Sequence, residues 1–342
     1  MSHKTSIIVP GLCGPLPEIE GIEQAARPLL ELLGRLHRQK RPVADYSTQV
    51  AALFGVNFND RFPDAALSLL AYGIDPGDGC WMHADPVNLE ADLDRAILSD
   101  SQVLHLREDE AAGLVELINT HFAEDGLTVN MADQNNWFIR LDDCSLATTP
   151  LRQAVGRDIN HLLPTGDSAK QWRRFLNEVQ MLLHTSEVNQ RREQRGMAAI
   201  NSLWFWGEGR LPPKSDTDIS HVYADDALTT GLAKHDQIAC SPLTDPIALA
   251  YAMKHDGHSL VSLNQLDGPC SYGDVSAWLD EMLALVEDWF KPVIETARSL
   301  DADVDIYPCN GMRYHFGHNN TFAFNPLKFW KKDRLQDHVD TH

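Results

Sequence analysis

The sequence predicts an α/β protein, with a mostly parallel sheet covered by helices on both faces and a smaller α+β domain inserted into it. In the first and last parts of the chain, short apolar runs typical of buried strands alternate with long helical patterns. The 342 residues exceed what one small core needs and suit two domains. Between about 86 and 200 the regular alternation stops. We therefore expect a discontinuous core, residues 1–85 and 201–342, around an inserted domain, residues 86–200.

The first part of the chain contains strand-like and helix-like patterns in turn. Residues 5–9 are apolar and run into a turn rich in glycine and proline, which predicts a buried strand. Apolar residues then recur at helical spacing through 19–38. We expect two shorter helices at 46–55 and 64–73, and a strand at 79–86 that stops at Pro86.

Further elements follow in the middle and the last part. We expect strands at 102–106, 137–141, 202–206, 259–264 and 303–307, and helices at 108–123, 168–195 and 272–299. Pro292 should kink the last helix, because proline deletes one backbone hydrogen bond. In parallel sheets the chemistry sits beyond the carboxyl ends of the strands, so we look for functional residues there.

Composition and charge exclude several classes of protein. The chain has no run of 18 or more apolar residues, and its first residues contain too short an apolar stretch for a signal peptide, so we expect a cytoplasmic protein. The formal net charge of −20 repels nucleic acid and anionic membranes. A small phosphorylated ligand stays open, because a few arginines can hold a phosphate inside an acidic protein.

The six cysteines are scattered and include no C-x-x-C pair. This spacing argues against a zinc finger or ribbon. We expect mostly reduced thiols in a reducing compartment.

An arginine-rich segment precedes a strand and a glycine-rich turn. It contains Asn189, Arg192 and Arg195, and Arg210 follows the turn. Guanidinium groups fit phosphate or carboxylate, and glycines let a backbone approach a ligand. The alternative is a solvated helix end whose positive charges complement the helix dipole.

Two carboxylates follow the strand at 259–264, at the functional end of the sheet. Asp267 and Asp274 could bind a divalent metal. Alternatively, Asp274 caps the helix that follows. The pair His255 and His258 precedes the strand, at the opposite edge, and indicates a polar connection. His315 and His318 follow the last strand, and we expect them to be surface or hydrogen-bonded side chains.

Taken in order, these segments resemble the archaeal-type, cofactor-independent phosphoglycerate mutases of the alkaline phosphatase superfamily. They resemble more closely a bacterial subgroup of regulatory proteins of the RpfE type. The segments that support the resemblance are 83–89, 177–184, 189–196, 201–209 and 272–274. The resemblance implies an alkaline-phosphatase-like core with an inserted substrate domain. It also implies two divalent ions that activate a serine, which takes and returns a phosphoryl group.

Several positions depart from the pattern that the resemblance implies. The first strand should end in Asp-Gly, with the Asp on a metal, but here Pro10 stands before Gly11. Tyr46 occupies the expected place of the serine nucleophile, and Ser47 is displaced by one residue. An Asp–His–Asp cluster becomes Asp267, Ser271 and Asp274, and a final Asp-His becomes Cys309-Asn310.

The lost ligands favour a non-catalytic protein. Proline has no donor atom in its side chain, and two neighbouring dications need several anionic or imidazole ligands. Asp267 and Asp274 would hold at most one ion, manganese or zinc, and we expect no other cofactor. The first hypothesis is therefore a pseudoenzyme that binds a phosphorylated ligand through Asn189, Arg192, Arg195 and Arg210. The second is an active mutase or phosphatase with a rebuilt site that uses Ser47 and histidines such as His83. The sequence identifies no protein partner.

Overall fold

A computed structural model of the chain describes residues 3–14, 16–17, 19–56, 58, 61–92, 95–243, 253, 257–317 and 335. The chain separates into two compact units. Unit 1 comprises residues 1–57 and 214–342, and unit 2 comprises residues 58–213. No helix among the described residues is long and apolar enough to cross a membrane.

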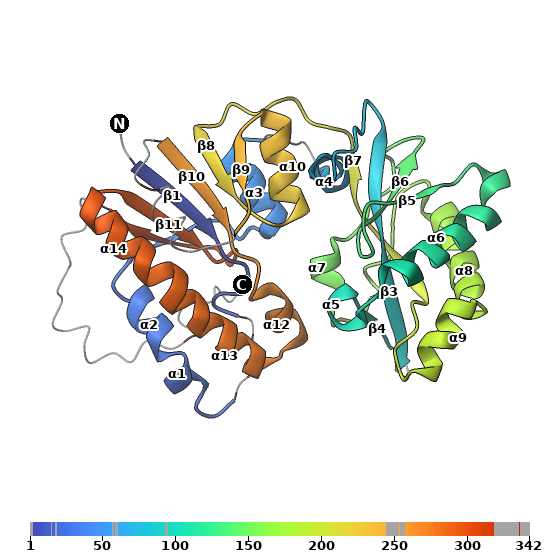
Figure 1. The fold of residues 1–342 in the computed structure, drawn as a ribbon, viewed down its shortest axis with the longest axis horizontal. Helices are drawn as coiled ribbons and strands as arrows, with labels where there is room; N and C mark the ends of the chain where they lie inside the picture. The colour runs from blue at the N-terminus through green and yellow to red at the C-terminus, as the bar shows by residue number, and fades with distance from the viewer. Residues whose placement is uncertain are drawn as a thin grey trace. The chain divides into compact units, whose positions relative to one another are not determined.

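Unit 1 contains a seven-stranded sheet in the order β2-β12-β11-β1-β10-β8-β9 (Figure 1). The strands are β1 (His3–Ile8), β2 (His37–Lys40), β8 (Ile219–Tyr223), β9 (Ala239–Ser241), β10 (Gly257–Ser262), β11 (Asp303–Tyr307) and β12 (Met312–Phe316). The five strands β11, β1, β10, β8 and β9 run parallel, whereas β12 and β2 join antiparallel at one edge. The sheet is therefore mostly parallel, as the alternation of strands and helices predicted.

Helices lie on both faces of this sheet. They are α1 (Ile22–Ala25), α2 (Arg27–Leu33), α3 (Tyr46–Phe54), α10 (Ala227–Asp236), α12 (Asp267–Tyr272), α13 (Val275–Ala284) and α14 (Lys291–Leu300), with the π-helical segment η2 (Leu285–Phe290) between the last two. On one face, buried residues of α2, α13 and α14 form a continuous core with the strands, such as Leu29, Trp278 and Val293 against Ile7 and Val261. On the other face, α3 and α10 lie near β10 (Figure 1). The hydroxyls of Tyr46 in α3 and Thr229 in α10 form a hydrogen bond with each other, and Tyr46 also bonds to Ser262 of β10.

Unit 2 contains an antiparallel sheet in which β3 (Cys80–Asp92) pairs with three other strands. The remaining strands are β4 (Arg95–Ser99), β5 (Val129–Met131), β6 (Trp137–Leu141) and β7 (Ser202–Gly209). The helices are α4 (Asp64–Ala71), α5 (Ser101–Leu104), α6 (Glu108–His121), η1 (Ala123–Asp125), α7 (Leu151–Ala154), α8 (Ala169–His184) and α9 (Glu187–Gln194). Buried residues of α6 and α8 pack with this sheet to form the core of the unit.

The architecture agrees with the predicted fold class, but the unit boundaries differ from the domain limits expected at 86 and 200. They fall at 58 and 213, because β3 and β7 pair along most of their length and so belong to one sheet. That pairing also explains why β3 continues past Pro86. The segment of β3 before Pro86 pairs with β6, and the segment after it pairs with β4. Between these two segments, the edge of β3 that faces β6 and β4 forms no strand-to-strand hydrogen bonds, so a proline without a backbone N–H is tolerated there.

Several predicted elements are wrong in extent or kind. The strand expected at 102–106 is the short helix α5. The helix expected at 19–38 ends at Leu33, and β2 begins at His37. The helix expected at 168–195 is interrupted at Ser186, which caps α9 by accepting a hydrogen bond from the backbone of Asn189. The expected kink near Pro292 takes the form of a π-helical segment directly before α14, whose first turn contains the proline.

Candidate functional site

A hydrogen-bonded cluster lies at the carboxyl end of β10, on the edge where a parallel sheet places its functional groups. We call it the strand-end cluster and define it as Tyr46, Asp226, Thr229, Ser262 and Asn264. Tyr46 is the first residue of α3, whose cap Asp45 accepts a hydrogen bond from the backbone N–H of Thr48. The cap fixes the start of the helix and so directs the tyrosine at position 46 toward the strand ends.

The Tyr46 hydroxyl is the centre of the cluster. It lies 2.7 Å from Thr229 Oγ1 and 2.7 Å from Ser262 Oγ. The amide of Asn264 donates to it at 3.3 Å. The tyrosine is only 4% exposed, so its phenol is held inside the protein rather than presented to solvent.

Asp226 supplies the cluster's single negative charge. Its Oδ2 accepts hydrogen bonds from Ser262 Oγ at 2.8 Å and from the amide of Asn264 at 3.2 Å. Its Oδ1 accepts from the backbone N–H of Thr229 at 2.9 Å, which caps α10. Because both oxygens already accept internal bonds, the carboxylate stabilises the fold of this edge.

The chemistry available to the strand-end cluster is limited. Two dications would require several anionic or imidazole ligands, whereas this cluster offers hydroxyls, one amide and one carboxylate. No group of three or more His, Cys, Asp or Glu side chains that could hold a metal occurs among the residues that the structure describes. The side chains seen here do not fit a pair of divalent ions.

Ser47 and Pro10, two residues at positions that the resemblance marks, lie close to the carboxyl ends of strands in unit 1. Ser47 follows Tyr46 in the first turn of α3 and is partly exposed. Pro10 is buried two residues after the end of β1. The glycine that follows it, Gly11, has a φ of +79°, and a Cβ there would lie 2.8 Å from the carbonyl oxygen of Leu266. Only glycine fits this close approach between the first strand's turn and the start of α12.

Asp267 and Asp274 lie at the beginnings of two successive helices. Asp267 is the first residue of α12. Asp274 caps α13, accepting a hydrogen bond from the backbone N–H of Ala277 at 3.0 Å. This is the helix-capping role that the sequence analysis had kept as its alternative. Metal binding by these two residues stays a prediction.

The turn between β11 and β12 contains the pair that stands where the resemblance implies Asp-His. Cys309 has a φ of +60°, an uncommon conformation for a residue other than glycine. Asn310 accepts a hydrogen bond from the backbone of Met312 at 3.2 Å, so its side chain shapes the turn into β12. Nearby, burial raises the pKa of Cys13 to about 12, despite hydrogen bonds with Tyr314 and Asn310, and the thiol is therefore neutral at ordinary pH.

The arginine-rich segment is engaged within unit 2. Arg192 is 1% exposed; its guanidinium donates to Glu110 Oε2 at 2.6 Å, to the carbonyl of Leu104 at 2.6 Å and to the carbonyl of Ala198 at 2.8 Å. Arg195 bonds to the other oxygen of Glu110 and remains partly exposed. Burial raises the pKa of Glu110, but the hydrogen bonds from Arg195, the Arg107 backbone and Arg192 outweigh it, and the net pKa lies below its ordinary value.

Asn189 and Arg210 also have partners inside unit 2. The amide of Asn189 donates to the carbonyls of Leu183 and Ile200 at 2.8 Å, and its oxygen accepts from the Ile200 backbone at 2.8 Å. These bonds join the start of α9 to the residues before β7. Arg210 is exposed and donates to the carbonyl of Asp78. Ligand binding by the four residues stays a prediction, while the structure assigns Asn189 and Arg192 a role in holding the unit together.

His83 is the centre of a buried charged cluster in unit 2. The imidazole is 2% exposed and lies between two carboxylates, with Nε2 3.1 Å from Asp64 Oδ1 and Nδ1 3.7 Å from Asp85 Oδ1. The ring stacks on Trp206 with centroids 4.0 Å apart, and the indole donates to Asp85 Oδ2 at 2.7 Å. Burial lowers the pKa of His83, but the charges of Asp85 and Asp64 and the hydrogen bond with Asp64 outweigh it and raise the pKa to about 9.

Of the histidine pair His315 and His318, the structure describes only His315, and this side chain is hydrogen-bonded. His315 Nδ1 lies 2.8 Å from Asp305 Oδ1, and Arg313 bonds to both oxygens of the same carboxylate. His318 lies outside the described residues, as does His255 of the first pair. His315 is therefore hydrogen-bonded, as expected.

A serine, a histidine and an aspartate are connected in the order of a hydrolase triad at β1 and β10. Ser6 Oγ lies 2.9 Å from His258 Nε2, and His258 Nδ1 lies 2.7 Å from Asp218 Oδ1. However, Ser6 is fully buried in the middle of a central strand, where a substrate cannot reach it. Burial also lowers the pKa of His258. We assign this connection a structural role.

Of the strand-end cluster, only Tyr46 stands out from the sequence. Asp226 and Thr229 follow β8, a short strand that mixes polar and apolar residues without regular alternation and was not predicted. Ser262 and Asn264 lie at the end of a predicted strand, and the rule that functional groups follow strand ends would have indicated them.

Comparisons with known proteins place this chain beside one family. The sequence model of the 2,3-bisphosphoglycerate-independent phosphoglycerate mutases matches residues 51–189. A Geobacter sulfurreducens protein, named a probable mutase of this kind, is 25% identical over 128 residues, which cover 37% of this chain and 32% of that protein. A mutase of this name from Methanothrix thermoacetophila is 27% identical over 117 residues, 34% of this chain and 29% of the relative. The matches thus span about a third of these relatives.

One solved structure supports the fold. A protein from Pyrococcus horikoshii has a TM-score of 0.53 at 15% identity, covering 92% of this chain and 87% of its own. The cofactor-independent phosphoglycerate mutase from Thermoplasma acidophilum has a TM-score of 0.43 at 13% identity, covering 93% and 90%. Part of this chain, residues 51–189, is thus similar in sequence to the cofactor-independent phosphoglycerate mutases, and the Pyrococcus horikoshii structure shows that the fold is shared.

Proposed function

We propose that this protein is a phosphoglycerate-mutase-like pseudoenzyme. It binds a small phosphorylated ligand, or has a regulatory role that depends on binding that ligand, and it does not transfer the phosphoryl group. The observation that carries the proposal is the position of Tyr46. At the place where the resemblance implies a serine nucleophile, a buried phenol bonds to the hydroxyls of Thr229 and Ser262. A phenol with two internal hydrogen bonds and 4% exposure is a poor nucleophile for an incoming phosphoryl group.

The losses around Tyr46 point in the same direction. Pro10 offers no ligand atom, Asp274 is engaged as a helix cap, and Asn310 is engaged in a turn. In a two-metal enzyme the ions activate the nucleophile and neutralise the charge of the transition state. Without them, most of the catalytic advantage is lost, while the fold and its ligand pocket can persist. The RpfE-type regulatory proteins, which the sequence resembles, suit this proposal.

For ligand binding we propose the exposed arginines. Arg195 and Arg210 keep part of their guanidinium groups in solvent, so they can reach a phosphate without breaking the buried pair between Arg192 and Glu110. Asn189 and Arg192 would then support the binding surface from inside the unit. The small ligand is the proposed partner; nucleic acid and membranes are excluded from the proposal by the net charge of −20.

A thermal-shift screen of phosphorylated metabolites, with and without manganese or zinc, tests this proposal. A ligand at 100 times its dissociation constant adds about 2.7 kcal/mol to the stability of the folded state. We expect such a shift without added metal, smaller in Arg195→Ala and Arg210→Ala but not in the control Arg174→Ala, whose guanidinium forms an exposed pair on α8. Stabilisation that requires manganese would contradict the proposal.

The alternative is an active phosphoglycerate mutase or phosphatase with a rebuilt metal site. It is favoured by the names of the relatives and by Ser47, which is partly exposed beside Tyr46. Asp267 would then serve as a ligand for one ion. Binding of manganese measured by calorimetry, and lost in Asp267→Asn, would support this alternative.

A further inference from the structure

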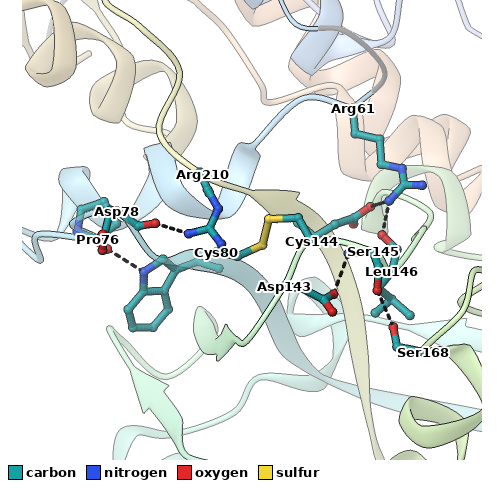
Figure 2. Close-up of a disulfide and its surroundings, with 12 residues drawn as sticks. Arg61, Pro76, Asp78, Cys80, Asp143, Cys144, Ser145, Leu146, Ser168 and Arg210 are labelled. Atoms are coloured by element: carbon teal, nitrogen blue, oxygen red, sulfur yellow. Dashed lines mark hydrogen bonds and ion pairs between the residues drawn. A yellow bond between two sulfur atoms is a disulfide. The ribbon is translucent and has the colours of Figure 1, made fainter.

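A loop of unit 2 is fastened to the central strand by a disulfide (Figure 2). Cys80, the first residue of β3, is fully buried and bonded to Cys144, which lies in the loop at 142–149 between β6 and α7. The two Cα atoms are 5.9 Å apart although 64 residues separate them in sequence. The expectation of mostly reduced thiols does not hold for this pair, whereas the other four cysteines form no disulfide.

The fold explains why these cysteines meet. In the antiparallel pairing of β3 with β6, Cys80 faces Leu141, the last residue of β6. Cys144 follows a few residues later, so the chain turns back beside the start of β3. Scattered positions in the sequence did not indicate this proximity, because it depends on the register of the two strands.

The loop contacts both ends of unit 2. The carbonyl of Leu146 accepts a hydrogen bond from Arg61, which lies shortly after the unit begins at Phe58 (Figure 2). Arg61 also forms an ion pair with Glu208 at 3.0 Å, and Thr148 donates to the other oxygen of Glu208. Glu208 lies near the end of β7, shortly before the unit ends at Pro213.

A second contact lies on the other side of the disulfide. Arg210, just after β7, donates to the carbonyl of Asp78, two residues before Cys80 (Figure 2). The cystine therefore lies between two sets of bonds, and both involve the segments through which the chain enters and leaves unit 2. The loop has other attachments: Trp204 donates to the Thr149 carbonyl at 2.9 Å, and Ala147 pairs with Thr165. Opening the disulfide would therefore loosen the loop without removing all its contacts.

The disulfide is accessible from the loop side. Cys144 is partly exposed, and its neighbours Asp143 and Ser145 are exposed, whereas Cys80 is covered. A thiolate of a small dithiol can attack the sulfur of Cys144, which breaks the S–S bond and releases Cys80 as a thiolate that then takes a proton. The second thiol of the reductant then attacks the mixed disulfide and releases Cys144. The protein gains two electrons and two protons, and the dithiol becomes a disulfide.

We propose that the Cys80–Cys144 disulfide is a reversible redox device that sets how firmly the loop at 142–149 holds the two ends of unit 2. In the oxidised form the loop is fastened and keeps its bonds to Arg61 and Glu208. In the reduced form the loop exchanges between bound and released states, so the entry and exit segments lose part of their support.

Hydrogen–deuterium exchange on the full chain, oxidised and then treated with dithiothreitol, tests the proposal. Alkylation under denaturing conditions should first count four free thiols in the oxidised protein and six in the reduced one. After reduction we expect the amides of 142–148, 61–64 and 207–210 to exchange about tenfold faster, the change that the loss of one net hydrogen bond would produce. Exchange in α8 and β10 should not change, and reoxidation should restore the original rates.

A variant checks that the effect depends on this bond. Cys144→Ser, on the accessible side, should exchange like the reduced protein under both conditions, whereas Cys240→Ser, which removes a free thiol in unit 1, should respond like wild type. If Cys144→Ser does not fold, reduction of the wild-type protein alone decides. The proposal is overturned if six thiols are already free without reductant, if native dithiothreitol leaves the disulfide closed, or if reduction accelerates exchange equally throughout unit 2.

Discussion

The buried histidine of unit 2 makes the stability of the protein depend on pH in a predictable direction. His83 is held between Asp64 and Asp85, and its pKa rises from 6.5 to about 9. Since one pKa unit corresponds to about 1.4 kcal/mol, this shift contributes about 3 kcal/mol to the free energy of unfolding. The folded-state pKa is the raised one, so the contribution is complete below pH 6.5 and is lost as the pH rises through about 9.

Urea denaturation at several pH values between about 6 and 10 measures this contribution, with the disulfide kept oxidised throughout. As the pH rises across that range, His83 should cause wild type to lose about 3 kcal/mol of its free energy of unfolding. His83→Gln should be less stable than wild type at pH 6, but its free energy of unfolding should fall less as the pH rises. The control His161→Gln changes an exposed histidine of the same unit and should follow wild type. A decline in His83→Gln as steep as that of wild type would refute the reasoning.

Three further substitutions test individual assignments. Glu110→Gln leaves the buried guanidinium of Arg192 without its counter-charge and should lower the free energy of unfolding by about 3 kcal/mol. The control Glu178→Gln removes the partner of the exposed Arg174 and should cost less than about 0.5 kcal/mol. If urea denaturation gives equal costs for the two variants, the buried pair is disproved. Asp274→Ala should lower the free energy of unfolding by about 1 kcal/mol, because the helix cap is lost. If manganese instead raises the melting temperature of wild type but not of this variant, Asp274 is a metal ligand. Tyr46→Phe should cost about 1–2 kcal/mol, because the hydroxyls of Thr229 and Ser262 lose a shared buried partner; an unchanged melting temperature would argue against the cluster.

The parts of the fold that the sequence could predict are those in which local pattern and tertiary packing agree. The segments at 259–264 and 303–307 contain several apolar residues, and the structure places β10 and β11 there, almost entirely buried because both faces of the sheet are covered. The helix at 46–55 was predicted within one residue, since Asp45 caps its start and Gly55 ends it in a left-handed conformation.

The missed elements are those whose formation depends on partners. The strands β12 and β8 mix polar with apolar residues, and β2 consists of polar residues only, so pairing with neighbours rather than their own pattern stabilises them. The segment at 102–106 has the composition of a strand, but Asp100 accepts a hydrogen bond from the backbone of Gln102 and starts a helical turn instead. Propensity alone could not decide between these alternatives.

In the candidate site, too, some residues could be predicted from the sequence and others could not. The substitutions at Pro10 and Tyr46 can be seen in the sequence because they stand at positions that the resemblance marks. The partners of Tyr46 cannot, since Thr229 and Ser262 are far from it in sequence and only the packing of α3 and α10 beside β10 brings their hydroxyls within 2.7 Å. Similarly, the charged cluster around His83 requires Asp64, whose approach depends on α4 packing against β3 and β7.

The claim that the strand ends no longer support phosphoryl transfer is tested most directly by a turnover assay. Purified full-length protein is incubated with phosphoglycerate and manganese, and both phosphoryl migration between the hydroxyls and release of inorganic phosphate are followed. The account predicts no turnover above that of buffer, with manganese or without it. Manganese-dependent turnover that persists in Tyr46→Phe and disappears in Ser47→Ala would contradict it, because Ser47 would then be a working nucleophile.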